Sequence, residues 1–466
     1  MRYISTRGKA PVLNFEEVVL TGLARDGGLY VPETWPQFSK DEIRSLAGMS
    51  YADAAAFLLQ PFLGECISEA DFKAMTAKAY ASFSHKAVVP VRQLDSNDFL
   101  MELYHGPTLA FKDVALQLLG LLYDHLLGRQ HRRATIIGAT SGDTGSAAIE
   151  ACRGRDAVDI FILHPAGRVS DVQRRQMTTV LDANVHNIAI EGDFDDCQAM
   201  VKAMFNDLEF RDELSVSAVN SINWARVMAQ IVYYFTVGVS LGAPERPIAF
   251  SVPSGNFGDV YAGYAASKMG LPIEQLIVAT NRNDILSRFF NSGEYRKSSV
   301  DPTISPSMDI QVSSNFERFL FDLHGCDGAA VSALMQKLDD EDGFAVNMSL
   351  LNEGIFSAGR CDEAETLATI RRTLEESAIT VDPHTAVGLK VGQECRKTAD
   401  TPLVTLATAH PAKFPDAVEK ATGEHPALPK HLANLFARDE RMMQLPNDLG
   451  TVKSYIRERA RILSAV

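Results

Sequence analysis

The chain lacks the sequence features of several broad classes of protein. No apolar run approaches the length that spans a membrane, and residues 1–15 have no apolar core of the kind found in secretory signals. The six cysteines include no CxxC pair, which favours free thiols in a reducing compartment. Neither the dinucleotide pattern GxGxxG nor the phosphate-loop pattern GxxxxGK[ST] occurs. We therefore expect a soluble, cytoplasmic protein that does not use the common nucleotide motifs.

The chain also has no excess of positive charge. Its 466 residues include 45 Lys and Arg against 59 Asp and Glu, a net charge of −14 at pH 7. Nucleic acids and anionic membranes attract basic surfaces, so we expect neither as a partner. With 46% hydrophobic and 22% charged residues, the composition is that of a globular protein too long for one hydrophobic core. We expect two or three domains.

Strand-like and helical patterns alternate after residue 85. Residues 1–85 are expected to form a separate, mostly helical domain, and residues 86–466 a catalytic region with a small subdomain at about 110–240. The expected strands lie at 134–139, 159–165, 186–192, 247–252, 275–281 and 403–409. The expected helices lie at 144–152, 170–180, 222–241 and 259–269, with another after Pro415. This alternation predicts an α/β fold of parallel sheets covered by helices, with an exposed loop or lid at 293–306.

Lys112 is the first candidate for chemistry. It is the second-to-last residue of the segment HGPTLAFKD (105–113) and stands where an apolar pattern of helical spacing begins. Packing can hold such a lysine while its amine points into a cleft. That arrangement suits a lysine that forms a Schiff base, since the amine must be unprotonated to attack a carbonyl.

Two glycine-rich segments strengthen this interpretation. TSGDTGS (140–146) and PSGNFGD (253–259) each follow an expected strand and open an expected helix. Such a turn presents free backbone N–H groups at a helix N-terminus, where an anion can bind. Two anion sites and a Schiff-base lysine together indicate a phosphorylated carbonyl cofactor.

These segments resemble the threonine synthase family, which uses pyridoxal 5'-phosphate. The resemblance also includes GLARDGGLYVPE near the N-terminus, NSINWAR (220–226), DPHTAVG (382–388) and TAHPAKFP (408–415), and it is closest to the bacterial and fungal branch. It implies a tryptophan-synthase-β-like fold with two parallel-sheet domains around a cofactor cleft. It also implies conversion of O-phospho-L-homoserine and water to L-threonine and phosphate, by a monomer or a homodimer.

The resemblance assigns cofactor-binding roles by position. Lys112 would bind the carbonyl carbon of the cofactor, Thr408 would lie beside the pyridine nitrogen, and Asp143 would approach the ring. The phosphate would lie on Ser254, Gly255, Asn256, Phe257 and Gly258. Many family members carry Asn where this chain has Asp143, and an ionised carboxylate cannot donate a hydrogen bond to the phenolic oxygen of the cofactor.

The substrate needs its own binding groups. By the resemblance, the loop of Ser141, Gly142 and Thr144 would hold the substrate carboxylate. A phosphate dianion calls for cationic donors, because Arg offers a fork of N–H groups and Lys a compact charge. The candidates for this task are Asn223, Arg226 and Lys413.

Other polar residues are expected to be structural. His384 and His410 have no partners at metal-ligand spacing, and the DFDD cluster at 193–196 is more typical of a helix cap than of a metal site. Two alternatives to the leading function stay open. One is a phospholyase or dehydratase that releases a 2-oxo acid, and the other is a non-catalytic protein that binds pyridoxal 5'-phosphate.

Overall fold

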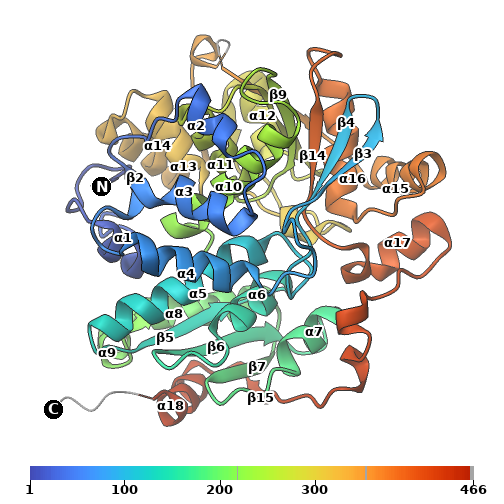
Figure 1. Cartoon of the computed structure of the whole chain (residues 1–466). Helices are drawn as coiled ribbons and strands as arrows, with labels where there is room; N and C mark the ends of the chain where they lie inside the picture. Colours follow the sequence, from blue (N-terminus) through green and yellow to red (C-terminus); the bar gives the residue numbers. More distant parts are fainter. Residues whose placement is uncertain (218, 352–353, 462–466) are drawn as a thin grey trace.

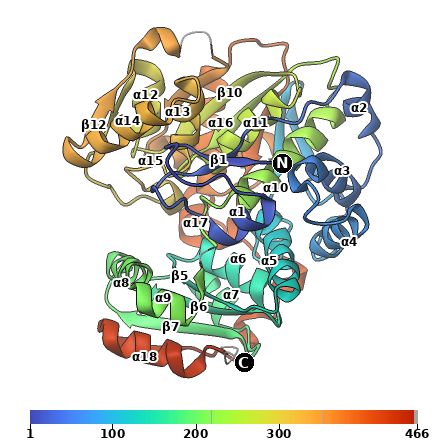
Figure 2. The ribbon, with the colours of Figure 1, turned by 90° about the vertical axis from the view of Figure 1, so that its left-hand side faces the viewer.

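The computed structural model of the chain describes residues 1–217, 219–351 and 354–461. It contains two sheet-based halves, one above the other in Figure 1, and the turned view of Figure 2 shows the same separation. Within the described residues, no helix is both long and apolar enough to cross a lipid bilayer.

The upper half is built on a six-stranded sheet of order β13-β10-β9-β14-β4-β3. All neighbouring strands are parallel except the β3–β4 pair. Its strands are β3 (Val91–Asp95), β4 (Asp98–Glu102), β9 (Ile248–Pro253), β10 (Ile273–Thr280), β13 (Phe356–Arg360) and β14 (Leu403–Ala407). Its helices are α11 (Gly258–Lys268), α12 (Ile285–Ser292), α13 (Phe316–Leu323), α14 (Gly328–Asp340), α15 (Glu363–Ser377), α16 (Pro383–Cys395) and α17 (Pro415–Thr422).

The lower half is a five-stranded, all-parallel sheet of order β15-β7-β6-β5-β8. Its strands are β5 (Ala134–Ala139), β6 (Val158–Pro165), β7 (Val185–Glu191), β8 (Val216–Ser217) and β15 (Met443–Pro446). One apolar cluster joins the sheet to α5 (Lys112–Arg129), α6 (Asp143–Cys152) and α7 (Asp171–Thr178). A separate cluster joins it to α8 (Phe194–Asn206), α9 (Leu208–Glu213) and α18 (Leu449–Arg459).

The N-terminal unit packs beside both halves. It consists of α1 (Phe15–Thr21), α2 (Lys40–Ser45), α3 (Tyr51–Leu63), α4 (Glu69–Tyr80) and the antiparallel pair β1 (Tyr3–Ser5) and β2 (Tyr30–Pro32). Its helix α3 contacts α10 (Trp224–Ser240), a buried helix that also packs on α5 and α11. Because α10 touches the N-terminal unit and helices of both halves, it places the strand ends of the two sheets relative to one another.

The structure confirms the strands and helices expected from the alternating pattern, each within a few residues. It also confirms that the DFDD cluster caps a helix, because the Asp193 side chain accepts a hydrogen bond from the Asp196 backbone N–H at the start of α8. Sequence reasoning did not foresee the β3–β4 pair or the return of β15 and α18 to the lower sheet. The domain boundaries at residues 85, 110 and 240 stay predictions.

Residues 293–306 were expected to form an exposed loop or lid. The exposed residues of this segment are followed by residues that the rest of the protein holds in place. The segment starts in a short antiparallel pair of β11 (Glu294–Arg296) and β12 (Gly343–Ala345) and runs into a 3-10 turn at Pro306–Met308. The carboxylate of Asp309 accepts hydrogen bonds from the side-chain amides of Asn281 (2.7 Å) and Asn283 (3.0 Å). These bonds anchor the turn close to the end of β10.

Candidate functional site

Lys112 is the first residue of α5, and the loop before it folds back onto the helix. The carboxylate of Asp113 accepts hydrogen bonds from the backbone N–H (2.8 Å) and the hydroxyl (2.7 Å) of Thr108. A Cβ on Gly106 would lie 2.4 Å from the Cβ of Asp113, so this close approach requires glycine. Burial raises the pKa of Asp113 to about 6, although the Thr108 donors oppose the shift. The folded loop fixes the backbone from which Lys112 projects.

The amine of Lys112 is buried and faces a carboxylate. Its Nζ lies 3.2 Å from Oδ2 of Asp143. Burial lowers the pKa of Lys112, the charge of Asp143 opposes this, and the charges of Lys413 and Arg226 lower it further. A lower pKa gives the amine a larger unprotonated, nucleophilic fraction. Lys112 is therefore suited to attack a carbonyl group.

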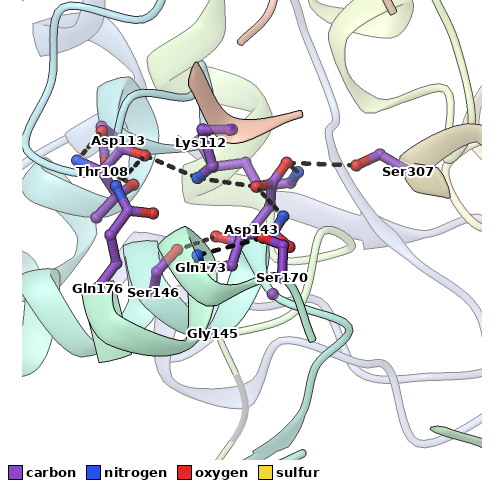
Figure 3. A network of polar contacts seen from close by, with 12 residues as sticks. Thr108, Lys112, Asp113, Asp143, Gly145, Ser146, Ser170, Gln173, Gln176 and Ser307 are labelled. Carbon is purple, nitrogen blue, oxygen red and sulfur yellow. Dashed lines mark hydrogen bonds and ion pairs between the residues drawn. The ribbon is translucent and has the colours of Figure 1, made fainter. Parts of the chain in front are cut away.

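Asp143, at the start of α6, is the centre of the polar network. Figure 3 shows Lys112, Gln173 and Ser307 converging on its carboxylate. Oδ1 accepts hydrogen bonds from Lys413 Nζ and Gln173 Nε2, both at 2.8 Å, and Oδ2 accepts one from Ser307 Oγ at 3.4 Å. Burial alone would raise the pKa of Asp143, but the charges of the two lysines hold it well below its ordinary value. Asp143 is therefore an anion that only accepts hydrogen bonds.

The TSGDTGS segment forms the turn between β5 and α6. The hydroxyl oxygen of Thr140 accepts hydrogen bonds from the backbone N–H groups of Gly142 and Gly145, each at 2.9 Å. Gly142 has a φ of 143°, which residues with side chains rarely adopt. Ser141 is exposed and Thr144 is half-buried, so both can reach a ligand. Since α6 begins without a side-chain cap, other N–H groups of its first turn can bind an anion.

The PSGNFGD segment forms the corresponding turn between β9 and α11. Phe257 has a φ of 59°, in the left-handed region, and α11 also begins without a side-chain cap. A Cβ on Gly255 would lie 2.5 Å from the carbonyl oxygen of Ser307, so glycine is needed where these two backbones meet. The turn therefore presents a helix N-terminus in a place where only the backbone fits, which is a suitable cradle for a phosphate.

Asp259, in the first turn of α11, repels a bound anion only weakly. Asp259 is buried and accepts hydrogen bonds from the hydroxyls of Tyr233 and Tyr234, the latter at 3.1 Å. Burial raises the pKa of Asp259 to about 7, although the two hydroxyls lower it. Near neutral pH a large fraction of Asp259 is therefore uncharged, and a phosphate at the start of α11 meets less repulsion than the sequence suggests.

The segment that follows β14 is bonded to the loop of Lys112. The backbone carbonyl of Thr408 accepts a hydrogen bond from the N–H of Phe111 at 2.8 Å. Lys413 is fully buried and donates to the carbonyl oxygen of Thr108 at 2.7 Å. The side-chain amide of Gln176 donates to the same oxygen at 3.1 Å. Thr408 and Lys413, both predicted from the sequence, thus lie beside Lys112.

Arg226 and Asn223 lie in the first turn of α10 and its cap. Asn223 caps the helix by accepting from the Ala225 N–H at 3.0 Å, and its amide donates to the Val19 carbonyl at 2.8 Å. Arg226 is buried, and its Nη1 donates to the Val219 carbonyl at 3.2 Å. Its Nε has no partner among the described residues, and burial lowers its pKa to about 10. A buried guanidinium left in this state is a ready donor for an anionic ligand.

Sequence reasoning missed several residues of the network. Gln173 and Gln176 lie three positions apart on one face of α7 and donate to Asp143 and to the loop of Lys112; this spacing was the available signal. His384, expected to be structural, accepts a hydrogen bond from the Ser307 N–H at 3.2 Å, and its Nδ1 lies 2.7 Å from Asp382. No sequence signal connects His384 with Ser307, because they belong to distant segments.

Nothing in the described part of the chain forms a metal site. No group of three or more His, Cys, Asp or Glu side chains there is arranged to hold a metal ion. His410, the other histidine expected to be structural, accepts a hydrogen bond from the Ala412 N–H at 3.1 Å, and burial lowers its pKa to about 4.

Comparisons with known protein families agree on one assignment across the chain. Residues 2–80 match the family model described as the threonine synthase N terminus, and residues 385–456 match the one described as threonine synthase, C-terminal. Residues 88–361 match the model of pyridoxal-phosphate dependent enzymes. This last match contains Lys112 and both glycine-rich turns.

Individual relatives align over nearly the whole length. The threonine synthase of Pseudomonas aeruginosa is 57% identical over 459 residues, which cover 98% of each chain. The crystal structure of threonine synthase from Brucella melitensis with bound pyridoxal phosphate is 57% identical, has a TM-score of 0.97 and aligns over 99% of this chain and 100% of its own. The yeast threonine synthase structure is 41% identical, with a TM-score of 0.94 over 98% of each chain.

Proposed function

The chain belongs to the threonine synthase family, and we propose that the site around Lys112 converts O-phospho-L-homoserine and water to L-threonine and phosphate. The protein is a lyase that depends on pyridoxal 5'-phosphate. The observation that supports the proposed site most strongly is the buried amine of Lys112, 3.2 Å from Asp143 at the N-terminus of α6, which has no side-chain cap.

The residues present fit pyridoxal 5'-phosphate. Lys112 would bind its carbonyl carbon, residues 254–258 would hold its phosphate, and Thr408 would lie beside its pyridine nitrogen. The missing Cβ at Gly255 and the partly neutral Asp259 both favour a dianion at the start of α11. When bound, the cofactor draws electrons away from the substrate carbons next to the amine.

Lys112 has two tasks in this scheme. It first holds the cofactor, and after the substrate amine has displaced it, its free amine moves protons at Cα and Cβ of the substrate. The phosphate leaves Cγ with the electrons of the C–O bond, and water adds at Cβ. Because Lys413 is also paired with Asp143, at 2.8 Å, it would leave the carboxylate a cationic partner while Lys112 acts on the substrate.

The substrate would be held by groups on both sides of Lys112. The candidates are Ser141, Gly142, Thr144, Asn223, Arg226 and Lys413. The turn at 141–144 offers hydroxyls and N–H groups for the carboxylate, and Arg226 offers a guanidinium with a free Nε for the phosphate. Lys413 and Asn223 already make the hydrogen bonds described above, so each can contribute only its remaining N–H to the substrate.

The direct test is to incubate the protein, loaded with pyridoxal 5'-phosphate, with O-phospho-L-homoserine and to follow phosphate and threonine in parallel. We expect equal amounts of the two products. Phosphate released together with 2-oxobutyrate in place of threonine would establish the phospholyase alternative. Cofactor binding without any phosphate release would establish the non-catalytic alternative.

The setting in which the chain acts is also a proposal. The substrate is a small molecule, and we propose a cytoplasmic enzyme that works as a monomer or a homodimer without nucleic-acid or membrane partners. All six cysteines are free thiols in the structure, which agrees with a reducing compartment. The net charge of −14 supports the absence of polyanionic partners.

A further inference from the structure

A large cavity lies next to the site and is shared by several parts of the chain. Its volume is about 1200 Å³. It is lined by residues 20–27 of the N-terminal unit, by the carboxyl end of β5 with the first turns of α6, by α8, and by described residues between Val216 and Asn223. The wall formed by α6 includes Thr144 and Gly145, which directly follow Asp143. The cavity therefore reaches the turn that carries the carboxylate paired with Lys112.

The charge of this cavity is opposite to that of the whole chain. Its lining includes Arg25, Arg132, Lys202 and Arg211, and no Asp or Glu among the described residues. We call it the basic cavity, defined by these four side chains. In a chain with a net charge of −14, a concave surface of this kind creates a local positive potential.

The nearest acidic residue in sequence is occupied elsewhere. Asp26 follows Arg25 but does not line the cavity. Its carboxylate accepts hydrogen bonds from the Ser5 hydroxyl at 2.8 Å and from the backbone N–H groups of Lys9 (2.9 Å) and Ala10 (2.8 Å). The carboxylate of Asp26 thus stabilises the N-terminal loop and does not neutralise the charge of Arg25.

Two of the cations are free to meet a ligand. The side chains of Arg25 and Lys202 are exposed and form no hydrogen bond or ion pair within residues 1–217, 219–351 and 354–461. Within the same residues the guanidinium of Arg132 donates only to Gln130, at 3.0 Å, and that of Arg211 has one loose ion pair, at 3.5 Å, with the exposed Asp212. Exposed pairs of this kind contribute little and yield readily to a stronger anion.

The basic lining continues into a second, smaller cavity. This cavity, of about 360 Å³, shares Arg132 and Arg211 with the basic cavity and adds Arg133. Its one acidic lining residue in the described part of the chain is Asp212, the partner of Arg211. Arg133 is paired with Asp159 at 3.5 Å, so the positive charge that the two cavities share is that of Arg132 and Arg211, beside the edge strand β8.

We propose that the basic cavity is the path by which a phosphate monoester dianion reaches Lys112 and by which inorganic phosphate leaves. Arg25 of the N-terminal unit and Lys202 of α8 are its steering residues. Neither side chain is among the contacts of Lys112 or Asp143, so they attract the substrate without touching its reacting atoms. This inference rests on the proposed function, because only a phosphorylated substrate offers these cations a dianion.

Steering of this kind has a specific kinetic signature. Exposed charges accelerate the encounter of oppositely charged partners, and salt screens the effect over a Debye length of about 10 Å at 0.1 M. The charges should therefore raise kcat/KM at low salt and leave kcat unchanged. Salt should remove the advantage without affecting chemistry at Lys112.

The test compares two double variants that each remove two positive charges. Arg25→Gln with Lys202→Gln removes the steering residues, and Lys78→Gln with Lys337→Gln removes two exposed lysines of α4 and α14 that do not line either cavity. At about 20 mM salt we expect the first pair to lower kcat/KM about fivefold, with kcat within about twofold of wild type. At about 300 mM salt the difference should shrink to less than about twofold. If both pairs share the same kcat/KM and salt dependence, the steering role is wrong.

A binding measurement separates this inference from the proposed function. Inorganic phosphate is titrated calorimetrically into the cofactor-loaded protein, with no turnover required. We expect the Arg25→Gln, Lys202→Gln pair to bind phosphate about fivefold more weakly than the control pair, about 1 kcal/mol. Should wild type make no threonine while this difference persists, the proposed function fails and the anion path stands. Equal phosphate affinity in the two pairs overturns the path even if threonine is made.

Discussion

At the scale of single residues, the site has more buried positive than negative charge. Lys112, Lys413 and Arg226 are all buried, and the charges of the latter two act on Lys112, whereas Asp143 is the one carboxylate paired with either lysine in the described part of the chain. Buried charges are stable only with partners. An anionic substrate would supply the anionic partner that Arg226 lacks among the described residues.

Replacing Arg226 should separate stability from function. Arg226→Gln removes a buried cation without a carboxylate partner, so the unfolding free energy should rise by about 2 kcal/mol or stay level. The KM for O-phospho-L-homoserine should rise at least about tenfold, with cofactor affinity unchanged, because the phosphate loses its guanidinium. Steady-state kinetics and chemical denaturation measure the two effects. A variant that is less stable yet has a wild-type KM would make Arg226 purely structural.

Asp259 should make stability depend on pH. Its pKa is raised to about 7 in the folded state, so its stabilising contribution is complete below the unfolded pKa, about 4, and is lost as pH rises through about 7. Asp259→Asn keeps an acceptor for Tyr233 and Tyr234 but does not titrate. From about pH 4 to about pH 8 wild type should lose up to about 4 kcal/mol relative to the variant. Melting temperatures of both proteins across this range test it, and parallel curves would refute the assignment.

Whether a residue of the site could be predicted depends on how far away in the sequence its partners lie. Lys112 and the two glycine-rich turns could be predicted, because each is marked by neighbours a few positions away. The pairing of Lys413 with Asp143 and the approach of Ser307 could not, since these partners are brought together only by the packing of the two sheets. The raised pKa of Asp259 could not be predicted either, because burial in the folded protein causes it, against the opposing hydrogen bonds from Tyr233 and Tyr234.

At the scale of secondary-structure elements, the site is made of the turns between strands and helices. The turns after β5 and β9 and the loop before α5 all end in helices whose first residue follows no side-chain cap. Most helices away from the site, such as α3, α4 and α8, are capped by Ser or Asp. Because these helices begin at the site without a side-chain cap, backbone N–H groups of their first turns can bind anionic ligands.

The turn after β9 should lose its ligand when a single methyl group is added. Gly255→Ala places a Cβ 2.5 Å from the Ser307 carbonyl oxygen, which forces the two backbones apart. Pyridoxal 5'-phosphate affinity, measured by absorbance titration, should fall at least about tenfold, that is by about 1.4 kcal/mol or more. Gly128→Ala is the matched control, because its Cβ meets nothing within 4 Å. Equal affinities in the two variants would remove this turn from the cofactor site.

Elements with strong periodicity were predictable, and short or exposed ones were not. Buried strands such as β5, β6 and β10 each contain an apolar run of several residues. Strand β15, with the sequence MQLP, is mostly exposed and joins β7 from more than 250 residues away, so neither its composition nor its position in the chain indicates a strand. Helix α7 was expected, but its glutamines were not recognised as part of the site.

At the scale of the whole molecule, the C-terminal segment completes the lower sheet. Val452 and Ile456 of α18 are fully buried against β5–β7 and α8, and Arg461 Nε lies 2.6 Å from Asp159 on β6. The half that carries Asp143 thus depends on residues at the far end of the chain.

Weakening this attachment should loosen the lower half. Ile456→Ala leaves a cavity in its second apolar cluster and should cost about 3 kcal/mol of stability. The variant should melt at a lower temperature, and limited proteolysis should cut first between residues 134 and 217. Ser454→Ala, on the exposed face of the same helix, is the control and should behave like wild type. First cleavage within the upper sheet in the Ile456 variant would show that α18 does not support the lower half.

The proposed function depends above all on Lys112 being the residue that binds the cofactor carbonyl. The most direct measurement is reduction of the cofactor-loaded protein with borohydride, which makes the carbonyl–amine linkage permanent, followed by peptide mapping. Lys413 is an internal control, because it is also buried and also paired with Asp143, at 2.8 Å. The account predicts the label on the peptide that contains Lys112 and none on the peptide that contains Lys413. A label on Lys413, or on any other lysine, would contradict it.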